Sequence, residues 1–226
     1  MQKHITPIAI IENDYKEKFG IPRQSGRAKS VLSKIIFLKD FRFLDAVRGL
    51  EDFSHLWLIF DFSLIKQDKF SPLVRPPRLG GNKKVGVFAS RSPFRPNGLG
   101  LSCVKLEKID LEDSNAPILY VSGADLLDKT PIFDIKPYIP FADCQTDAIG
   151  GFADENADYK LNVVFEENVK EKVPQDKLTS LIECLSDDPR PSYQNDDRVY
   201  GMTFANFNVK FSVKDNTLTV HDVESL

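Results

Sequence analysis

The chain has 226 residues, of which 42% are hydrophobic, and a formal net charge of −3. That length is enough to bury one large core, or one medium and one small core. The longest apolar run, Leu56–Phe60, ends at Asp61 and is far shorter than the roughly 20 residues of a membrane helix. The N-terminal apolar patch is also too short for a signal peptide, so we expect neither a membrane span nor an export signal.

Most of the first 150 residues are predicted to form strands. Seven short segments are rich in Val, Ile, Leu and Phe and are bounded by Gly, Pro, Asp or Ser. They are Ile5–Ile11, Lys34–Leu38, His55–Phe60, Lys84–Phe88, Leu99–Lys105, Ile118–Ser122 and Ile132–Pro137. A helix is expected over residues 41–53, where Phe41, Leu44, Val47 and Leu50 recur at helical spacing. The pattern favours a mainly β fold, a small closed or nearly closed β-barrel of about seven strands.

The composition changes after Asp147. The stretch AIGGFADENADY is typical of a linker. Beyond it we expect a strand at Lys160–Phe165, a helix at Val169–Ser186, and a small antiparallel sheet. The strands of that sheet are Tyr200–Phe204, Asn208–Val213 and Thr217–Val220. We therefore predict a barrel domain at residues 1–150 and a small α+β domain at residues 155–226.

The three cysteines give no sign of a disulfide framework or a metal site. Cys103, Cys144 and Cys184 are widely spaced and odd in number, and no CxxC motif occurs. They are interpreted as buried, reduced thiols of a cytoplasmic protein, and no metal is expected.

The most informative stretch is Gly86–Ser102, GVFASRSPFRPNGLGLS. Its start, Val85–Phe88, is interpreted as part of a buried strand, and the loop after it is stiffened by Pro93 and Pro96. Arg91 and Arg95 are carried on that loop. Rigid loops with arginines are suited to binding a carboxylate, a phosphate or a nucleic-acid backbone.

Positive charge is concentrated in the same region. Residues 69–106 contain eight Lys or Arg and no Asp or Glu, although the whole chain is slightly acidic. Such a local field attracts polyanions and makes their binding depend on salt. The alternative is a solvated surface loop with incidental lysines.

Common nucleotide and hydrolase motifs are absent from the sequence. No GxGxxG turn joins a strand to a helix and no Walker loop occurs, so a Rossmann-type methyltransferase is not expected. A hydrolase finds little support, because neither an HExxH nor a Ser–His–Asp pattern appears.

Several ordered motifs resemble those of the TsaA/TrmO family of tRNA methyltransferases, and together they span nearly the whole chain. The long tract is preceded by RPPRLGG (75–81) and followed by DLLD (125–128) and DIKPY (134–138). Further matches are YKEKF (15–19), PRQ (22–24), RGLE (48–51), SHLW (54–57), DPRP (188–191) and YGM (200–202). Gly98 and Lys129 depart from the family pattern, which often has proline and glycine there.

The resemblance implies a β-barrel enzyme that works as a homodimer. Such enzymes use S-adenosylmethionine to methylate N6 of N6-threonylcarbamoyladenosine at position 37, beside the anticodon of a threonine tRNA. By position, the cofactor site falls on Pro22, Arg23, Gln24, His55, Leu56, Arg91, Leu101, Asp125, Leu126, Leu127 and Asp128.

Three residues are assigned to catalysis under this resemblance. Arg91 is expected to pair with the cofactor carboxylate or a substrate phosphate, and Asn97, together with Arg95, to position the modified base. Lys136 is expected either to contact RNA or to neutralise Asp134. These roles follow from charge and from position in the motifs.

Other residues keep two or more interpretations. His55 lines the cofactor pocket, is a hydrogen-bonded residue at the barrel rim, or is a general base. Asp125 and Asp128 bind the ribose or face the sulfonium, or simply form turns. Phe94 is a candidate to stack on a base.

Binding to tRNA phosphates is assigned to basic residues outside the pocket. They are Arg75, Arg78, Lys83, Lys84, Arg95 and Arg190. The C-terminal domain, with Arg190 and Tyr193, is expected to contact the tRNA or to support the dimer. The competing hypothesis is a barrel that binds RNA or a nucleotide without catalysis; it needs the basic surface but not the converging acids and histidine.

Overall fold

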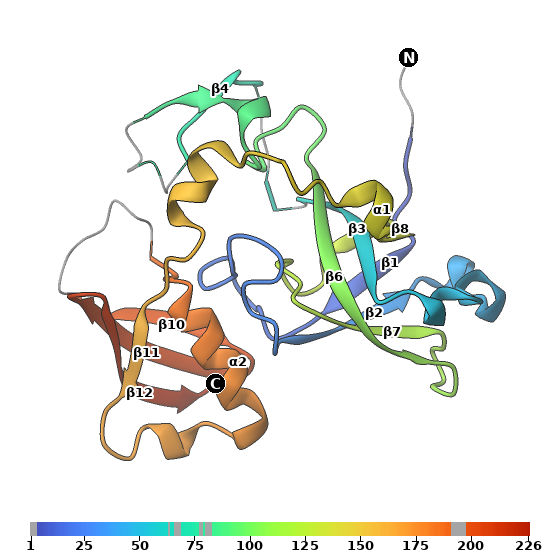
Figure 1. The fold of residues 1–226 in the computed structure, drawn as a ribbon. Helices are drawn as coiled ribbons and strands as arrows, with labels where there is room; N and C mark the ends of the chain where they lie inside the picture. Colours follow the sequence, from blue (N-terminus) through green and yellow to red (C-terminus); the bar gives the residue numbers. More distant parts are fainter. Residues whose placement is uncertain (1–3, 63, 66–68, 77–78, 80–82, 191–197) are drawn as a thin grey trace.

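The structure, a computed structural model, describes residues 4–62, 64–65, 69–76, 79, 83–190 and 198–226. It contains a closed barrel of six antiparallel strands in the order β1-β2-β7-β6-β3-β8 (Figure 1). The strands are β1 (Ala9–Glu12), β2 (Leu32–Phe37), β3 (His55–Asp61), β6 (Leu99–Asp110), β7 (Ile118–Ser122) and β8 (Pro131–Pro137). The predicted β-barrel is confirmed, with six strands in place of about seven.

Alternating side chains fill the barrel. On β3, Leu56, Leu58 and Phe60 point inward and are at most 4% exposed. Gly100 of β6 lies opposite Phe60, and a methyl group on Gly100 would come within 2.2 Å of the Phe60 ring. The Phe60 ring therefore occupies the space that a side chain at position 100 would need.

The strand predicted at Lys84–Phe88 is wrong in extent and in place. Only β5 (Val85–Gly86) is extended, and it pairs with β4 (Leu73–Val74) in a two-stranded sheet outside the barrel. Val87–Ala89 forms a 3-10 turn, and Phe88 is 74% exposed. Apolar composition alone therefore misled the prediction, because this run is not part of the barrel wall.

The helix predicted at residues 41–53 is also wrong. The segment forms three short 3-10 turns, at Lys39–Phe41, Leu44–Val47 and Leu50–Asp52. Gly49 has φ of +83°, which interrupts any helix, and among the apolar residues at helical spacing only Val47 is buried. Short helices depend on packing an apolar face, and this segment does not bury one.

The C-terminal part is an α+β unit, as predicted, with a sheet in the order β10-β11-β12-β9. Its elements are β9 (Asn162–Phe165), α2 (Gln175–Ser186), β10 (Tyr200–Phe204), β11 (Phe207–Lys214) and β12 (Thr217–Ser225). The three predicted tail strands pair antiparallel, as expected. β9, which the prediction did not include in that sheet, joins it parallel to β12. Pro174 delays the start of α2 beyond the predicted Val169, since the residue before a proline disfavours helix. A 3-10 turn, Lys170–Lys172, precedes it.

The connection between β1 and β2 leaves the barrel and joins the C-terminal core. Tyr15, Ala28 and Val31 are buried in the same cluster as α2 and the C-terminal sheet. The Glu17 carboxylate accepts the Thr203 N–H at 2.5 Å, and the Asp14 carbonyl accepts the Ala205 N–H at 2.8 Å. In Figure 1 this blue segment lies between the barrel and the red sheet. The two parts of the chain therefore share an N-terminal segment.

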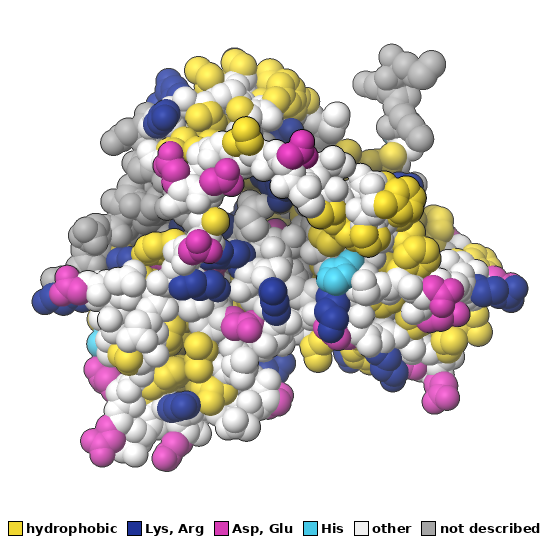
Figure 2. Space-filling view, in the orientation of Figure 1, with side chains coloured by type: hydrophobic (Ala, Val, Ile, Leu, Met, Phe, Trp, Pro, Cys, Tyr) yellow, Lys and Arg dark blue, Asp and Glu magenta, His cyan; other side chains and the backbone are white. Residues whose placement is uncertain are grey.

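The segment between the barrel and the C-terminal sheet is largely exposed. It contains α1 (Pro140–Asp143) and a 3-10 turn at Gly151–Asn156. Phe141 and Ile149 are each 90% exposed, and Figure 2 shows hydrophobic side chains gathered on the surface around α1. Cys144 is exposed, so the prediction of buried thiols is wrong for it; Cys184 is buried and Cys103 half-buried. None of the helices in the described ranges is long and apolar enough to cross a membrane.

We expect Gly100→Ala to destabilise the fold by about 1–3 kcal/mol, because its methyl group would overlap the buried Phe60 ring. Urea denaturation measures this free energy of unfolding. Gly86→Ala is the matched control, since its new methyl group would meet no atom within 4 Å. Equal stability of the two variants would show that the Phe60 ring does not limit position 100.

Candidate active site

Within the tract Gly86–Ser102, residues 90–98 form a loop that leads into β6, and Arg95 holds this loop together. Its Nη1 donates to the Ser90 carbonyl at 2.8 Å and to the Val87 carbonyl at 3.4 Å. The guanidinium carbon lies 5.8 Å from the centre of the Phe88 ring. Arg95 thus has a role within the loop that the sequence did not predict, beside its predicted tRNA contact.

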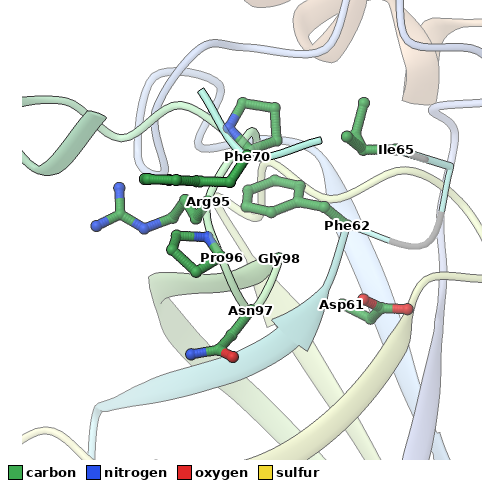
Figure 3. Close-up of a pocket in the computed structure, with 9 residues that line it drawn as sticks. Asp61, Phe62, Ile65, Phe70, Arg95, Pro96, Asn97 and Gly98 are labelled. Carbon is green, nitrogen blue, oxygen red and sulfur yellow. The ribbon is translucent and has the colours of Figure 1, made fainter. Parts of the chain in front are cut away.

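The tip of the loop lines a cavity of about 280 Å³. Its wall includes Asn97, Gly98, and Asp61 from the end of β3. Figure 3 shows the rings of Phe62 and Phe70 close together, with the polar ends of Asn97 and Asp61 pointing apart. Asn97 and Phe94 are exposed. Both side chains are therefore accessible to a substrate base.

A polar cluster lies where the loop meets the β1–β2 connection. The Arg91 Nη1 donates to Gln24 Oε1 at 2.6 Å. Asp125, which follows β7, accepts a hydrogen bond from the Ser102 hydroxyl on β6. The Ser25 backbone N–H lies close enough to favour the ionised form of Asp125 as well. Burial raises the pKa of Asp125, although the Ser102 hydrogen bond and the positive charge of Arg91 act in the opposite direction. Three of the predicted site residues, Gln24, Arg91 and the partly buried Asp125, are therefore brought together.

The other apolar residues of the predicted cofactor site differ in accessibility. Leu56 and Leu126 are fully buried in the barrel core, so neither presents its side chain to a ligand. Pro22 is buried and Leu127 half-buried. Leu101 points outward from β6 and is 55% exposed.

Asp128 binds other partners than Asp125 does. Its carboxylate accepts the Asn13 N–H at 2.9 Å and pairs with Lys16 at 2.8 Å. It lines a second cavity, of about 370 Å³, together with Lys34 and Tyr120 of β2 and β7. The structure thus shows a structural role for Asp128, and the interpretation as a turn residue fits this placement.

His55 and Lys136 lie at the other end of the barrel from Asn97. β3 begins at His55 and ends at Asp61, which corresponds to about 20 Å at 3.3 Å per residue. His55 Nδ1 is 2.9 Å from the Ser54 hydroxyl, and its ring packs on Tyr138. Lys136 is exposed and forms an ion pair with Asp134 at 3.4 Å. Of its two expected roles, this contact matches neutralisation of Asp134. Within one chain, the structure does not bring these two residues to Asn97.

Two predicted arginines are held within the fold. Arg190 is only 7% exposed, and its Nε and Nη2 bind the Asp188 carboxylate at 2.9 and 3.0 Å, so it is not presented to a phosphate. The Asp188 hydrogen bonds raise the pKa of Arg190. Arg23 donates from Nη2 to the Arg190 carbonyl. The expectation that Arg190 contacts tRNA is therefore corrected.

The remaining basic residues are exposed or lie outside the described residues. Arg75, Lys83 and Lys84 are exposed, whereas Arg78 and Tyr193 fall outside the described ranges. Within those ranges, no group of three or more His, Cys, Asp or Glu is placed to hold a metal ion.

Sequence reasoning missed Ser102 and Ser25 as members of the polar cluster. Ser102 sits at an inward position of β6, between the buried Gly100 and Val104. A hydroxyl at a position that alternation assigns to the core requires a hydrogen-bonding partner. That signal was available in the sequence, whereas the Ser25 contact uses a backbone N–H and has no side-chain signature.

We expect Asp125→Asn to change how stability depends on pH. Because burial raises the pKa of Asp125, the folded chain keeps a proton that the unfolded chain releases at lower pH. Stability therefore falls as pH rises from about 4 through the folded pKa in the wild type, and Asp125→Asn removes this fall.

Thermal unfolding from pH 4 to 7 tests this, with Asp45→Asn, at an exposed carboxylate, as the control. A variant that loses stability relative to wild type as pH rises would show that the ionised carboxylate supports the fold.

Known proteins are similar to this chain over almost its whole length. The model of the tRNA-methyltransferase O N-terminal domain matches residues 10–144, and that of the TrmO C-terminal domain matches residues 158–226. An Escherichia coli K12 protein named tRNA (adenine(37)-N6)-methyltransferase is 40% identical over 228 residues, covering 96% of each chain.

Two further relatives come from Pseudomonas aeruginosa. One, provisionally named an S-adenosylmethionine-dependent methyltransferase, is 42% identical over 213 residues, covering 89% of each chain. The other is a crystal structure titled TrmO, with a TM-score of 0.81, 33% identity, and coverage of 100% of this chain and 99% of that chain. These matches show that the chain belongs to the tRNA-methyltransferase O family.

Proposed function

We propose that this chain is a tRNA methyltransferase that transfers a methyl group from S-adenosylmethionine to N6 of N6-threonylcarbamoyladenosine at position 37. The observation that carries the proposal is the cluster of Arg91, Gln24 and Asp125, which come from three separate family motifs. Binding of RNA alone needs a basic surface but no partly buried carboxyl group beside an arginine, so the non-catalytic alternative is disfavoured.

The chemistry of the cluster fits the proposed methyl donor. S-adenosylmethionine carries a carboxylate, two cationic groups and a ribose diol. Arg91 offers a fork of N–H donors to a carboxylate, and Asp125 offers an acceptor to a hydroxyl or a cation. Gln24 supplies an amide next to Arg91. The residues present therefore complement a small nucleoside that carries both cationic groups and a carboxylate.

When bound, S-adenosylmethionine supplies a methyl group on a positively charged sulfur. In the reaction the N6–methyl bond forms as the methyl–sulfur bond breaks, and the N6 proton leaves to a base or to water. We assign Arg91 and Gln24 to holding the donor, and Asn97 to orienting the modified base. Such orientation supplies roughly 7–11 kcal/mol in favourable systems and needs no nucleophilic side chain.

We further propose that exposed basic residues bind the tRNA backbone. Arg75, Lys83 and Lys84 precede the loop and are exposed, which suits sequence-independent phosphate contacts. The exposed Phe94 is assigned to stacking on a base of the anticodon loop. Binding of tRNA that does not weaken as salt increases would contradict the phosphate assignment.

We also propose a cytoplasmic homodimer in which residues 1–150 form the catalytic domain and residues 155–226 support the tRNA or the dimer. The exposed Phe141 of α1, and Ile149 further along the same segment, suit a second copy of the chain. Dimerisation offers a way for His55 and Lys136, distant from Asn97 within one chain, to approach a partner's loop.

We expect Phe141→Glu to convert the dimer to a monomer of 25.6 kDa, because it places a charge in the apolar patch. Light scattering measures the mass, and Phe43→Glu, at an exposed phenylalanine far along the chain from α1, is the control. A monomeric wild type would remove the proposed dimer.

The reaction is tested with labelled methyl donor and tRNA from cells that do, or do not, install the threonylcarbamoyl group. Digestion then locates the label. Label on N6 of the modified adenosine, and only with modified tRNA, is the expected result. Donor binding without transfer would point to another acceptor, and absence of donor binding would favour the non-catalytic alternative.

We expect Arg91→Lys to lower kcat/KM by about 10-fold or more, because a lysine cannot supply the guanidinium fork that bonds Gln24 and faces Asp125. Steady-state methyl transfer measures the effect. Arg48→Lys, at an exposed arginine paired with Asp45, is the control and should retain wild-type rates. Full turnover by Arg91→Lys would contradict a role for the fork.

A further inference from the structure

The loop of residues 22–27, called here the donor loop, carries Arg23 and Gln24 and is fixed to the barrel on one side. The Gly26 N–H donates to the Gly123 carbonyl at 2.8 Å. Both glycines have φ of +76°, and a Cβ on Gly123 would lie 3.3 Å from the Gly26 Cα. Close backbone contact therefore anchors the loop just before Asp125.

On its other side the donor loop is held by Asp187, the residue that follows α2. Asp187 is 3% exposed. Its carboxylate accepts the Arg23 backbone N–H at 3.3 Å and the Arg27 Nε at 2.5 Å. A single buried carboxylate of the C-terminal part thus binds both ends of the segment that contains Gln24.

The arginine side chains of the donor loop extend the same attachment. Arg27 Nη2 donates to the Tyr159 carbonyl at 2.7 Å, and its Nη1 donates to the Ala157 carbonyl. Arg23 Nη2 donates to the Arg190 carbonyl. The Arg23 bond is partly buried and the two Arg27 bonds are exposed. All three come from charged guanidinium groups and end on fixed backbone carbonyls, so they restrain the position of the loop.

From this arrangement we infer that Asp187 is a positioning residue for the methyl-donor site, acting through the donor loop. Asp187 binds Arg23 and Arg27, the residues that flank Gln24 and Ser25 in the donor loop. The Gln24 amide must be in place to accept the Arg91 hydrogen bond at 2.6 Å. The inference rests on the proposed function, and it makes the C-terminal part a determinant of donor affinity.

The test is Asp187→Asn in the full chain. The loss of one charged hydrogen bond predicts an about 10-fold higher Kd for S-adenosylmethionine by calorimetry. The kcat at saturating donor and the KM for tRNA should stay within about two-fold, because Asp187 is buried and is proposed to act only through the donor loop. The matched control is Asp14→Asn: the Asp14 carboxylate binds Lys177 of α2 at 2.6 Å and does not touch the donor loop.

A second measurement is independent of the donor. Amide hydrogen exchange over residues 21–28 should speed up in Asp187→Asn and not in Asp14→Asn. If Asp187→Asn does not fold, Arg27→Lys replaces it, since lysine keeps the charge but loses the Tyr159 and Ala157 bonds. Unchanged donor affinity in the folded variant overturns the inference.

Failure of the inference and failure of the proposed function give different results. Arg91→Ala with wild-type donor affinity would place the donor elsewhere and remove the proposed site. Weak donor binding by Arg91→Ala together with wild-type donor binding by Asp187→Asn would keep the site and overturn only the role of Asp187. A lower kcat with unchanged donor Kd in Asp187→Asn also overturns it.

Discussion

The arrangement of the molecule depends on the path of the chain between β1 and β2. Asn13 pins the start of this path: its Nδ2 donates to the Leu126 carbonyl at 2.8 Å, and its Oδ1 accepts the Tyr15 N–H at 2.9 Å. Tyr15 is then buried in the C-terminal core, and Leu32 returns the chain to the barrel. A connection between two paired strands is usually short, so this long detour has a structural purpose. It ties two cores together and leaves the donor loop between them.

Strand positions were predictable because alternation and burial agree in the barrel. β3, β6, β7 and β8 lie where Val, Ile, Leu and Phe recur between turn residues. The failures share one cause. The runs at residues 41–53 and 84–88 have the composition of buried elements, yet Phe43 and Phe88 face solvent. Composition records how apolar a segment is, whereas burial depends on a neighbouring surface that local sequence does not specify.

The candidate site was also only partly predictable from the sequence. The motifs located Arg91, Gln24 and Asp125, which the fold brings together although more than 100 residues separate the first and last along the chain. They did not reveal that Arg190 forms an ion pair with Asp188, or that Asp128 forms one with Lys16. A charged side chain is equally compatible with a ligand and with an internal partner, and only the three-dimensional contacts distinguish them. The pairing of Asp187 with Arg27, 160 residues apart, carries no local signal at all.

The contacts from Asp14 and Glu17 to the C-terminal sheet have a consequence for solubility. β10 is an outer strand of that sheet, and an outer strand with free N–H groups is a template for pairing with another chain. Here Glu17 accepts the N–H of Thr203 in β10, and the Asp14 carbonyl accepts the N–H of Ala205 just after it, so the N-terminal segment occupies this end of the edge. The barrel has no such strand, because it closes on itself. The N-terminal segment therefore protects the C-terminal part from aggregation. A fragment that lacks this segment would expose the edge of β10 and the apolar side chains that Tyr15, Ala28 and Val31 cover.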